Sequence, residues 1–394
     1  MDNVSIRKDG KKLFVELKGH IDSANAGDIE KVINTGMSEL SPVSVELDCT
    51  DLSYISSAGL RIILRIKKAI DDTSLVNVSS DVYEVLDMTG FTEMMDVKKA
   101  YRVLSVEGAE IIGQGANGKV YRIDADTIVK VYLNPDALPE IHRERELARI
   151  AFVSGIPTAI PYDVVKIEGG GYGSVFELLN AKSFAKLLIT GEKTVDEVAR
   201  MSIDLLKQIH GTVVKEGSMP DMKETALDWA SFLKDYLPND KAEKLVSLVS
   251  AVPKDLHLLH GDYHIKNVML QNGEALLIDM DTLCYGHPVF ELASMFNAYA
   301  GFHSIGEPSA ASFLGIPTET ADLLWNKLIR LYLEGRSTEE IEAVEKKAQL
   351  IGYTRLMRRT IRRHGFDSET GRASIEICKE KILALLDEVD TLLF

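Results

Sequence analysis

The chain has 394 residues, a length that favours two or three domains over a single core. A hydrophobic share of 45% with 27% charged residues is ordinary for folded globular protein and argues against long disorder. The 45 basic and 60 acidic residues leave a net charge of −15, which disfavours a broad nucleic-acid-binding surface.

Cysteine pattern and hydropathy indicate the compartment. The 3 cysteines are far apart and lack any paired spacing, so we expect neither a disulfide framework nor a cysteine zinc site. We find no charged-then-apolar leader and no run of about 20 apolar residues. We therefore expect a cytoplasmic protein with no membrane partner and no nucleic-acid partner.

The first hundred residues alternate strand-like and helix-like patterns. Leu13–Leu17 and Val43–Leu47 are short β-type runs. Each is followed by a stretch, near 24–40 and 58–70, whose apolar residues recur at three- and four-residue spacing. This alternation predicts an α/β domain with helices on a sheet. Asp22 and Ser23 are a candidate cap for the first helix.

Residues 51–61 read D-L-S-Y-I-S-S-A-G-L-R and place small hydroxyl residues directly before a helix. A helix N-terminus offers unpaired N–H groups and a positive dipole end, which would stabilise a phosphate there. The local chemistry alone favours a simple serine cap. Both interpretations stay open at this point.

This stretch resembles the phosphorylation-site loop of STAS domains, the anti-sigma-factor antagonist family. Residues 19–22 (G-H-I-D) and 85–91 (V-L-D-M-T-G-F) also resemble that family's early turn and closing helix, so the resemblance covers about 1–103. It implies a sheet covered by helices that binds a protein partner rather than catalysing a reaction. By position Ser57 matches the phosphorylatable serine, whereas Ser56 stands where antagonists commonly carry an acidic residue.

From residue 111 the pattern changes after a join near 97–106 that lacks Pro/Gly-rich composition. Apolar runs separated by turn residues predict two pairs of strands, with a helix between the pairs. The strands are expected at 120–123, 127–132, 162–167 and 174–178, and the helix at 139–152. Beyond residue 181 we expect mainly helices, except for a section from 256 to 281 that carries further motifs.

Residues 113–120 read G-Q-G-A-N-G-K-V, with glycines at Gly113, Gly115 and Gly118. Such a loop fits both dinucleotide folds and kinases. Strand residues and then Lys130 follow it, and a glycine-rich loop followed by a strand lysine is the kinase arrangement. The glycines would let the backbone approach phosphates, and Lys130 would supply charge to the α- and β-phosphates. The plainer alternative is a tight hairpin with an exposed lysine.

Lys130 needs an anionic partner on the following helix. Glu144 shares the helical stripe of Ile141 and Leu147, whereas Glu146 points well away from it. We therefore predict Glu144 as the partner, against the alternative of an ordinary solvated glutamate.

The strongest signal is the segment 259–270, L-H-G-D-Y-H-I-K-N-V-M-L, followed after a turn by 276–281, L-L-I-D-M-D. Phosphoryl transfer needs a carboxylate that orients the acceptor, and oxygen ligands for magnesium, set beside one another. Asp262 can accept or align the acceptor's proton, and Asn267 and Asp279 can hold the metal.

This set resembles the aminoglycoside phosphotransferase and choline kinase-like branch of the kinase superfamily, over about residues 104–394. The resemblance implies a two-lobed protein-kinase-like fold, with an N-lobe at 104–180, a mainly helical C-lobe at 181–394 and ATP between them. It assigns Asp262 as catalytic base and Asn267 and Asp279 as Mg²⁺ ligands. Backbone groups of Glu177 and Leu179, in the expected interlobe hinge, would contact adenine. Residues 286–293 resemble the family's G-x-P-x-x-D-L-A, with Glu291 replacing the usual aspartate, a change expected to affect packing more than chemistry.

The acceptor is less defined by the sequence. His264 and the D-M-D turn are of small-molecule-kinase type, and the short stretch between Asp279 and Glu291 leaves little room for an activation segment. Arginines recur at three- and four-residue spacing in a helix expected near 352–364; they could bind an anion, but such a run is more often a solvated face.

Three functions remain open. The first is a small-molecule kinase with a STAS-like regulatory or docking domain. The second is a signalling kinase that phosphorylates Ser57 of its own or a partner chain. The third is a non-catalytic nucleotide-sensing scaffold, which is disfavoured because every expected catalytic residue type is present.

Overall fold

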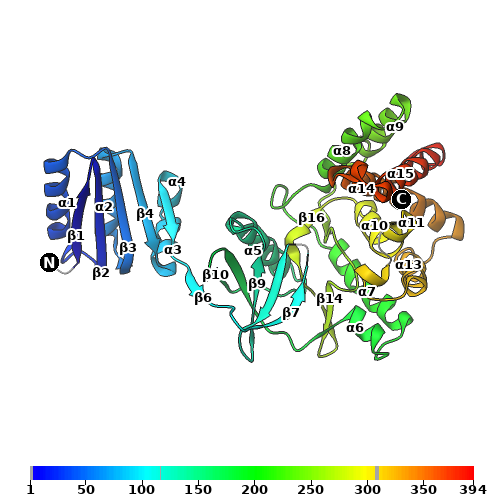
Figure 1. Ribbon diagram of the computed structural model, residues 1–394, viewed down its shortest axis with the longest axis horizontal. Coiled ribbons are helices and arrows are strands. Elements are labelled where there is room, and N and C mark those ends of the chain that lie inside the picture. The colour runs from blue at the N-terminus through cyan, green and yellow to red at the C-terminus, as the bar shows by residue number, and fades with distance from the viewer. Residues whose placement is uncertain (1–2, 116, 307–309) are drawn as a thin grey trace. The chain divides into compact units, whose positions relative to one another are not determined.

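The computed structural model describes residues 3–115, 117–306 and 310–394, and the chain divides into two compact units. The first contains Met1–Glu107 with Val164–Tyr172, and the second contains Gly108–Asp163 with Gly173–Phe394. Figure 1 shows the first unit as a sheet with helices and the second as a β-rich part followed by a helical part. Among the described residues, no helix is long and apolar enough to cross a membrane.

The first unit is an α/β domain with a sheet of strand order β1-β2-β3-β4-β5, as the alternation of patterns predicted. β1 runs antiparallel to β2, and the other neighbours are parallel. Leu13, Val15 and Leu17 alternate into the core of this unit, which explains why the segment forms a strand with one buried face. The strands are β1 (Val4–Asp9), β2 (Lys12–Ile21), β3 (Ser44–Ile55), β4 (Asp72–Val78) and β5 (Asp96–Lys99), and the helices are α1 (Ala26–Leu40), α2 (Ser57–Ala69), α3 (Ser80–Met88) and α4 (Phe91–Met94).

Two local expectations in this unit are wrong. α1 begins at Ala26 after Asn25, and the Asp22 side chain accepts a hydrogen bond from the backbone of Ala24, so it stabilises a turn before the helix. The segment expected to join the domains starts inside the sheet, because Val97 in β5 pairs with Leu75 in β4. β6 (Arg102–Leu104) follows and pairs in parallel with β10 (Asp163–Ile167).

The start of α2 separates the two neighbouring serines. Ser56 is the N-cap, and its hydroxyl accepts a hydrogen bond from Ala58 N at 3.2 Å. Ser57 is the first helical residue and is exposed. The cap interpretation of the sequence therefore applies to Ser56, and the hydroxyl of Ser57 faces solvent.

The β-rich part of the second unit is an antiparallel array in which β8 pairs with β7 and β9, and β9 with β11. Its core includes Val129 of β9, which pairs with Val175 of β11, and both residues are fully buried. α5 follows β9 and turns Leu147, Ala148 and Ala151 inward. The elements are β7 (Glu110–Gln114), β8 (Gly118–Arg122), β9 (Thr127–Tyr132), α5 (Leu138–Val153) and β11 (Tyr172–Glu177).

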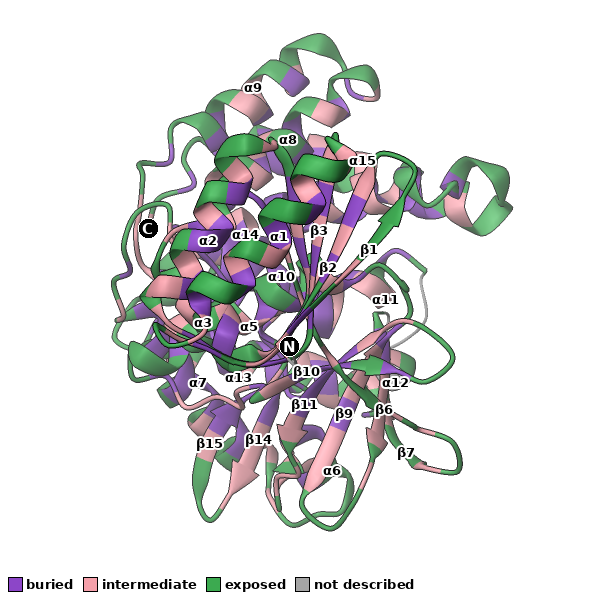
Figure 2. Ribbon diagram, turned by 90° about the vertical axis from the view of Figure 1, so that its left-hand side faces the viewer, coloured by how far each residue is buried: buried purple, intermediate pink, exposed green. Residues whose placement is uncertain are grey.

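The remainder of the second unit is mainly helical, as predicted. Between its helices, β14 and β15 form a hairpin that β12 extends on the β14 side, while β13 pairs with β16. Figure 2 shows exposed and buried positions alternating along α8 and α9, as expected for helices that cover a core on one side. The strands are β12 (Lys182–Ser183), β13 (Leu258–Leu259), β14 (Val268–Gln271), β15 (Glu274–Leu277) and β16 (Cys284–Tyr285). The α-helices are α6 (Phe184–Ile189), α7 (Val195–His210), α8 (Met222–Phe232), α9 (Asn239–Ser250), α10 (Val289–Phe296), α11 (Phe302–Ser304), α12 (Ala310–Phe313), α13 (Thr318–Tyr332), α14 (Thr338–Arg362) and α15 (Glu369–Glu388).

The arginine-bearing helix is longer than the sequence predicted. α14 begins at Thr338, after a capping box in which Ser337 and Glu340 satisfy each other's backbone N–H groups. Its second half is largely buried, from Leu350 to Ile361. The expectation of a solvated arginine face is therefore wrong for Arg355, Arg358 and Arg359, which are partly buried, whereas Arg362 and Arg363 are exposed as expected.

Candidate active site

Lys130 lies at the meeting point of three elements that are far apart in the sequence. Its Nζ is 2.9 Å from Glu144 of α5 and 2.8 Å from Asp279, which follows β15. The side chain is 15% exposed. Burial alone would lower the pKa of Lys130, but the charges of Asp279 and Glu144 outweigh it and raise that pKa. A permanently charged lysine is thus held between two carboxylates 14 and 149 positions away.

Glu144 is fixed by more than the lysine. Its second carboxylate oxygen accepts a hydrogen bond of 2.5 Å from the hydroxyl of Tyr132, which lies 3.2 Å from Ser174 Oγ. Glu146, the rejected alternative, is exposed and pairs with Arg149 one turn away on the same helix. The helical phase of α5 therefore separates the two glutamates in the way the sequence predicted.

The glycine-rich loop joins β7 to β8, and position 116 lies outside the described residues. Gly115 N donates to Gly118 O at 3.0 Å, which closes the loop on itself. A Cβ at Gly118 would lie 2.3 Å from the carbonyl oxygen of Val131 on β9, so only glycine fits that close approach. Asn117 donates from Nδ2 to an Asp281 oxygen at 2.9 Å, which ties the loop tip to the aspartate pair.

The aspartate pair follows a tight hairpin. Asn272 and Gly273 both have positive φ and turn β14 into β15. Asp279 has a φ of 65°, a left-handed conformation that costs free energy in a residue with a Cβ and tends to occur at functional positions. Burial raises the pKa of Asp281 to about 6, and the charge of Asp279 adds to that effect.

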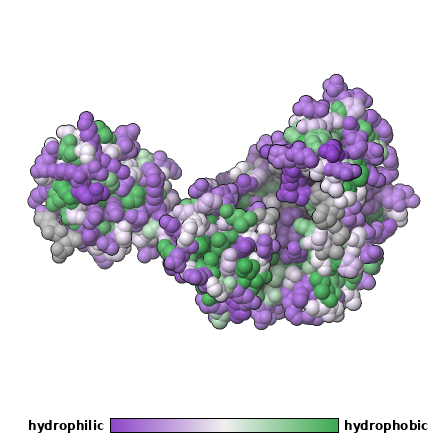
Figure 3. All heavy atoms as spheres, viewed as in Figure 1, coloured by the Kyte–Doolittle hydropathy of each residue, from purple (hydrophilic) through white to green (hydrophobic). Residues whose placement is uncertain are grey.

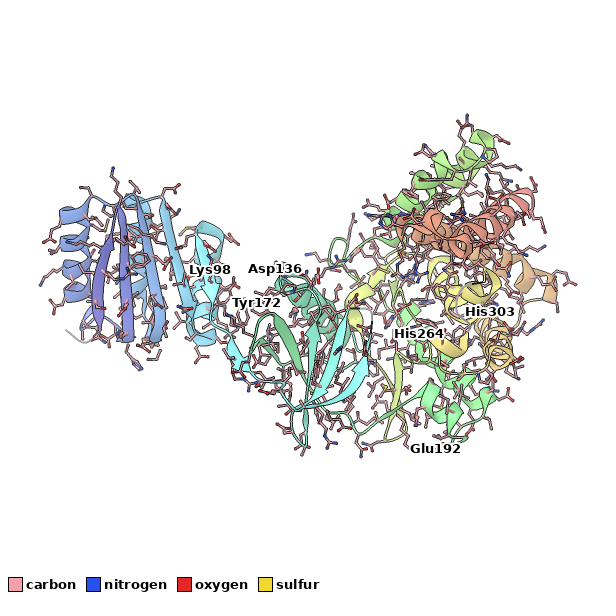
Figure 4. The ribbon with its side chains drawn as sticks, viewed as in Figure 1. Lys98, Asp136, Tyr172, Glu192, His264 and His303 are labelled. Carbon is pink, nitrogen blue, oxygen red and sulfur yellow. The ribbon has the colours of Figure 1, made fainter. Side chains whose placement is uncertain are left out.

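Asp262 lies in the loop between β13 and β14. Its side chain is 38% exposed, and one of its oxygens is 3.5 Å from Nε2 of His264. His264 is buried, and Figure 4 marks its position. Burial would raise the pKa of Asp262, but the interaction with the nearby His264 and the charge of Arg355 lower it to about 2. The carboxylate is therefore ionised at neutral pH.

The backbone around Asp262 is tightly constrained. Gly261 has a φ of 80°, and a Cβ there would lie 2.4 Å from the carbonyl oxygen of Thr282. Asn267 donates from Nδ2 to the carbonyl oxygen of Asp262 at 3.0 Å, and its own backbone carbonyl accepts from Ile278 N at 3.0 Å. Since the amide nitrogen of Asn267 is used in this way, its Oδ1 is the atom left to act as a ligand.

Glu291 of α10 anchors the same loop from beneath. It is fully buried, and its carboxylate accepts backbone hydrogen bonds from His260 at 2.5 Å, Gly261 at 3.0 Å and Tyr263 at 3.4 Å. Burial would raise the pKa of Glu291, but the interaction with His210, whose Nε2 lies 3.9 Å away, and the nearby His260 lower it. Glu291 thus fixes the backbone that carries Asp262, and the expectation that this replacement affects packing more than chemistry stays a prediction.

Arg355 of α14 approaches the loop from the other side. Its Nη1 donates to Gly261 O at 3.3 Å and to Ser294 Oγ at 3.0 Å, and Ser294 donates to the same Gly261 carbonyl. The guanidinium lies 5.4 Å from the ring centroid of Trp229 on α8. The arginine run thus reaches the loop that carries Asp262.

These elements border one hollow of the second unit. Figure 3 shows the surface hollowed between the β-rich and helical parts, with hydrophilic residues along the wall next to α8 and α14. Lys130 contacts Asp279 directly, and Asn267 is hydrogen-bonded to the backbone of Asp262. The residues predicted from separate motifs therefore form two groups, Lys130 with Asp279 and Asp262 with Asn267. Glu177 and Leu179, which the sequence predicts to lie in the interlobe hinge, flank Leu178, whose N–H donates to Asp126 O at 2.7 Å. Their hinge role stays a prediction.

The phosphotransferase enzyme family matches residues 108–315, more than half of the chain. The chain belongs to this family. The STAS domain family matches residues 3–104, in agreement with the resemblance of the N-terminal motifs.

Solved structures share the fold of this phosphotransferase at low identity. A thermostable mutant of the aminoglycoside phosphotransferase APH(4)-Ia, in ternary complex with ADP and hygromycin B, is 12% identical with a TM-score of 0.50, over 72% of this chain and 95% of that chain. Another APH(4)-Ia structure is 11% identical with a TM-score of 0.50, over 71% and 93%. A choline/ethanolamine kinase family protein from Mesorhizobium loti is 15% identical with a TM-score of 0.45, over 71% and 88%. The two structures with a TM-score of 0.50 establish the fold alone, and the predicted two-lobed architecture after a STAS-like domain is confirmed. No curated protein sequence matched the chain.

The donor set of this phosphotransferase fits magnesium better than a transition metal. Among the described residues no group of three or more His, Cys, Asp or Glu side chains is arranged to hold a metal. Magnesium needs fewer protein ligands, because it is usually held by one or two carboxylates together with phosphate oxygens and water. Asp279 and the amide oxygen of Asn267 are oxygen donors of the right kind.

Sequence reasoning missed several residues of the site. Tyr132 lies two positions after Lys130 on β9, and this spacing on a strand places both side chains on one face, so the signal was present. Asn117 and Asp281 stood inside quoted motifs, but no sequence pattern pairs residues 164 positions apart. Ser294 carried no signal at all, since it contacts the loop only through its hydroxyl.

Proposed function

We propose that this member of the phosphotransferase enzyme family is an ATP- and Mg²⁺-dependent kinase that phosphorylates a small-molecule hydroxyl. In this proposal residues 1–103 are a STAS-like regulatory or docking domain, 104–180 the N-lobe and 181–394 the C-lobe. The observation that carries the proposal is the contact of Lys130 with both Glu144 and Asp279. That convergence of a strand lysine, a helix glutamate and a hairpin aspartate is what phosphate binding in a kinase requires.

Nucleotide binding is assigned to the β-rich part and the hinge. Gly113, Gly115 and Gly118 let the loop backbone approach the phosphates, and Lys130 neutralises their charge. The backbone of Glu177 and Leu179 would hydrogen-bond adenine. Bound Mg²⁺ would neutralise charge on the phosphate oxygens, held by Asp279 and by Oδ1 of Asn267.

Asp262 is assigned to the acceptor. Because its pKa is about 2, it is ionised at neutral pH and can accept a hydrogen bond from the acceptor hydroxyl. The hydroxyl oxygen then bonds to the γ-phosphorus, the bond to the β–γ bridging oxygen breaks, and the hydroxyl proton passes to Asp262 as ADP leaves. A carboxylate of such low basicity acts mainly by orienting the hydroxyl, which suits a loose phosphoryl-transfer transition state.

A small acceptor is supported by the chain between Asp279 and α10. This stretch contains only the short helix Met280–Thr282 and β16 before Val289. It lacks the length of a segment that could dock a protein substrate beside Asp262. We assign the acceptor to the class of small alcohols.

The test is a screen of a metabolite library for ADP formation by the full chain with Mg-ATP, with Asp262→Ala as the blank. The proposal expects at least one acceptor that the wild type turns over and the variant does not, while the variant still binds Mg-ATP. Equal ADP formation by both proteins across the library would refute it.

A second candidate is a signalling kinase that phosphorylates Ser57. The exposure of this hydroxyl at the first position of α2 favours it as an acceptor. Incubation with labelled ATP followed by mass spectrometry decides the question, because an unlabelled Ser57 under turnover conditions eliminates this candidate. Binding of Mg-ATP without turnover of any acceptor would instead favour a nucleotide-sensing scaffold.

A further inference from the structure

Two arginines of α14 lie over aromatic rings of α8, and one of them, Arg355, also contacts the loop that carries Asp262. Arg355 stacks on Trp229 at 5.4 Å from the ring centroid, and Arg358 stacks on Phe232 at 5.6 Å. Both rings belong to α8. A guanidinium that lies over a ring keeps its N–H groups in the guanidinium plane, where they can meet a planar anion edge-on.

Arg358 has donor capacity that the protein does not use. Its side chain is only 19% exposed, and its Nη2 donates to Asp228. Its Nε is buried and has no hydrogen-bond partner in the described part of the chain. A buried, unpaired N–H of a charged group is costly unless a ligand satisfies it.

The two arginines also share one face of α14, and both contact residues of α8. They are three positions apart on α14, so their side chains are helical neighbours about one turn, or ~5 Å, apart. Arg355 contacts Gly261, the residue before Asp262, and its charge contributes to the low pKa of the Asp262 carboxyl. The Asp228 carboxylate that pairs with Arg358 is 64% exposed and therefore weakly held.

We infer that Arg355 and Arg358 form an anion-binding subsite of the acceptor pocket, so that the acceptor is a small alcohol carrying a carboxylate or phosphate group. The inference rests on the proposed function. It predicts an acceptor with a negative charge, whereas amino sugars and amino alcohols are positively charged. Arg358 binds the anion through Nε and the guanidinium N–H groups on the same edge, and the anion displaces Asp228. Arg355 is fixed by Gly261 and Ser294 and adds positive charge between the anion and Asp262.

The test is calorimetric titration of the full chain, with and without saturating Mg-AMP-PNP, using four probes of similar size. Glycerol phosphate and glycerate carry the two anions, glycerol is neutral, and serinol is cationic. Binding of one or both anions, with no binding of glycerol or serinol, is the expected result. The comparison of glycerol phosphate with glycerate shows which anion the subsite prefers.

Variants of α14 and α8 connect the binding to the subsite. Arg358→Gln should weaken anion binding about 10- to 100-fold, the loss typical of a charge-assisted hydrogen bond, and Arg358→Lys should fall between. Asp228→Asn should bind the anion as tightly as the wild type or more tightly, because it removes a competitor. Arg363→Gln, an exposed arginine at the end of the same helix, is the matched control and should change nothing.

Failure of the inference is distinguishable from failure of the proposed function. Three results overturn the anion subsite: preferential binding of serinol or glycerol, failure of both anions to bind, or an unchanged anion affinity in Arg358→Gln. None of these results affects Mg-AMP-PNP binding, which is measured in the same protein and tests the kinase proposal. The titrations without nucleotide test the subsite even where nucleotide binding fails.

Discussion

Replacing Glu291 with glutamine tests how the loop that carries Asp262 is held. Glu291 is fully buried and accepts hydrogen bonds from three backbone N–H groups, those of His260, Gly261 and Tyr263. Glutamine has nearly the same shape but presents an NH₂ group where the carboxylate presents its second oxygen. At least one backbone donor would then face another donor in a site without access to water.

The expected cost is about 3–5 kcal/mol of stability, the range for removing one charged member of a buried hydrogen-bonded group. Both of the chain's 2 tryptophans, Trp229 and Trp325, lie in the second unit, so their emission during urea unfolding reports on that unit alone. We also expect turnover to fall about 100-fold, because a small displacement of Asp262 misplaces the acceptor. Glu376→Gln, an exposed glutamate on α15, is the control.

The pH dependence gives a second observable with a defined sign. The folded-state pKa of Glu291 is lowered from 4.5, so the stability it provides is present above pH 4.5 and is lost as pH falls through the folded value. The urea midpoint of the wild type should therefore fall more steeply on acidification than that of Glu291→Gln. A glutamine variant with wild-type stability and turnover would refute the role assigned to this carboxylate.

Two further substitutions test the nucleotide side of the site. Glu144→Gln removes one of the two charges that hold Lys130, and we expect Mg-AMP-PNP binding to weaken about 10-fold in calorimetry; unchanged affinity would show that the ion pair is dispensable. Gly118→Ala brings a Cβ to 2.3 Å from Val131 O and should lower stability by about 1–3 kcal/mol in urea unfolding. Gly115→Ala meets open space and should leave stability unchanged, so equal stability losses in the two variants would contradict the steric argument.

Much of the fold was accessible from local patterns. A short β-type run placed Leu13–Leu17 in a strand, and the helical phase of α5 was sufficient to pair Lys130 with Glu144 rather than Glu146. Motif order predicted that Asp279 would meet Lys130, because a glycine loop, a strand lysine and an I-D-x-D hairpin have a single known arrangement in kinases. The assignments of Asp262, Asn267 and the hinge to chemical roles remain predictions.

What the sequence could not supply depends on tertiary environment. The arginines of α14 are spaced like a solvated face, and only the packing of α8 against α14 buries Arg355 and Arg358 on aromatic rings. Glu291 looked like a conservative replacement, since nothing local shows that three N–H groups of a loop some 30 positions earlier converge on it. Asp22 was misassigned because its turn ends just before the helix begins.

The central claim is that Lys130, Asp279 and Asn267 together bind a magnesium-complexed triphosphate. The most direct measurement is the ratio of AMP-PNP affinities with Mg²⁺ and with EDTA, in the wild type and in Asp279→Asn. We predict that the wild type binds AMP-PNP at least about 10-fold more tightly with Mg²⁺ than with EDTA. In Asp279→Asn this ratio should fall to near one, because a metal-binding carboxylate has been removed. A variant that keeps the wild-type ratio would contradict the claim.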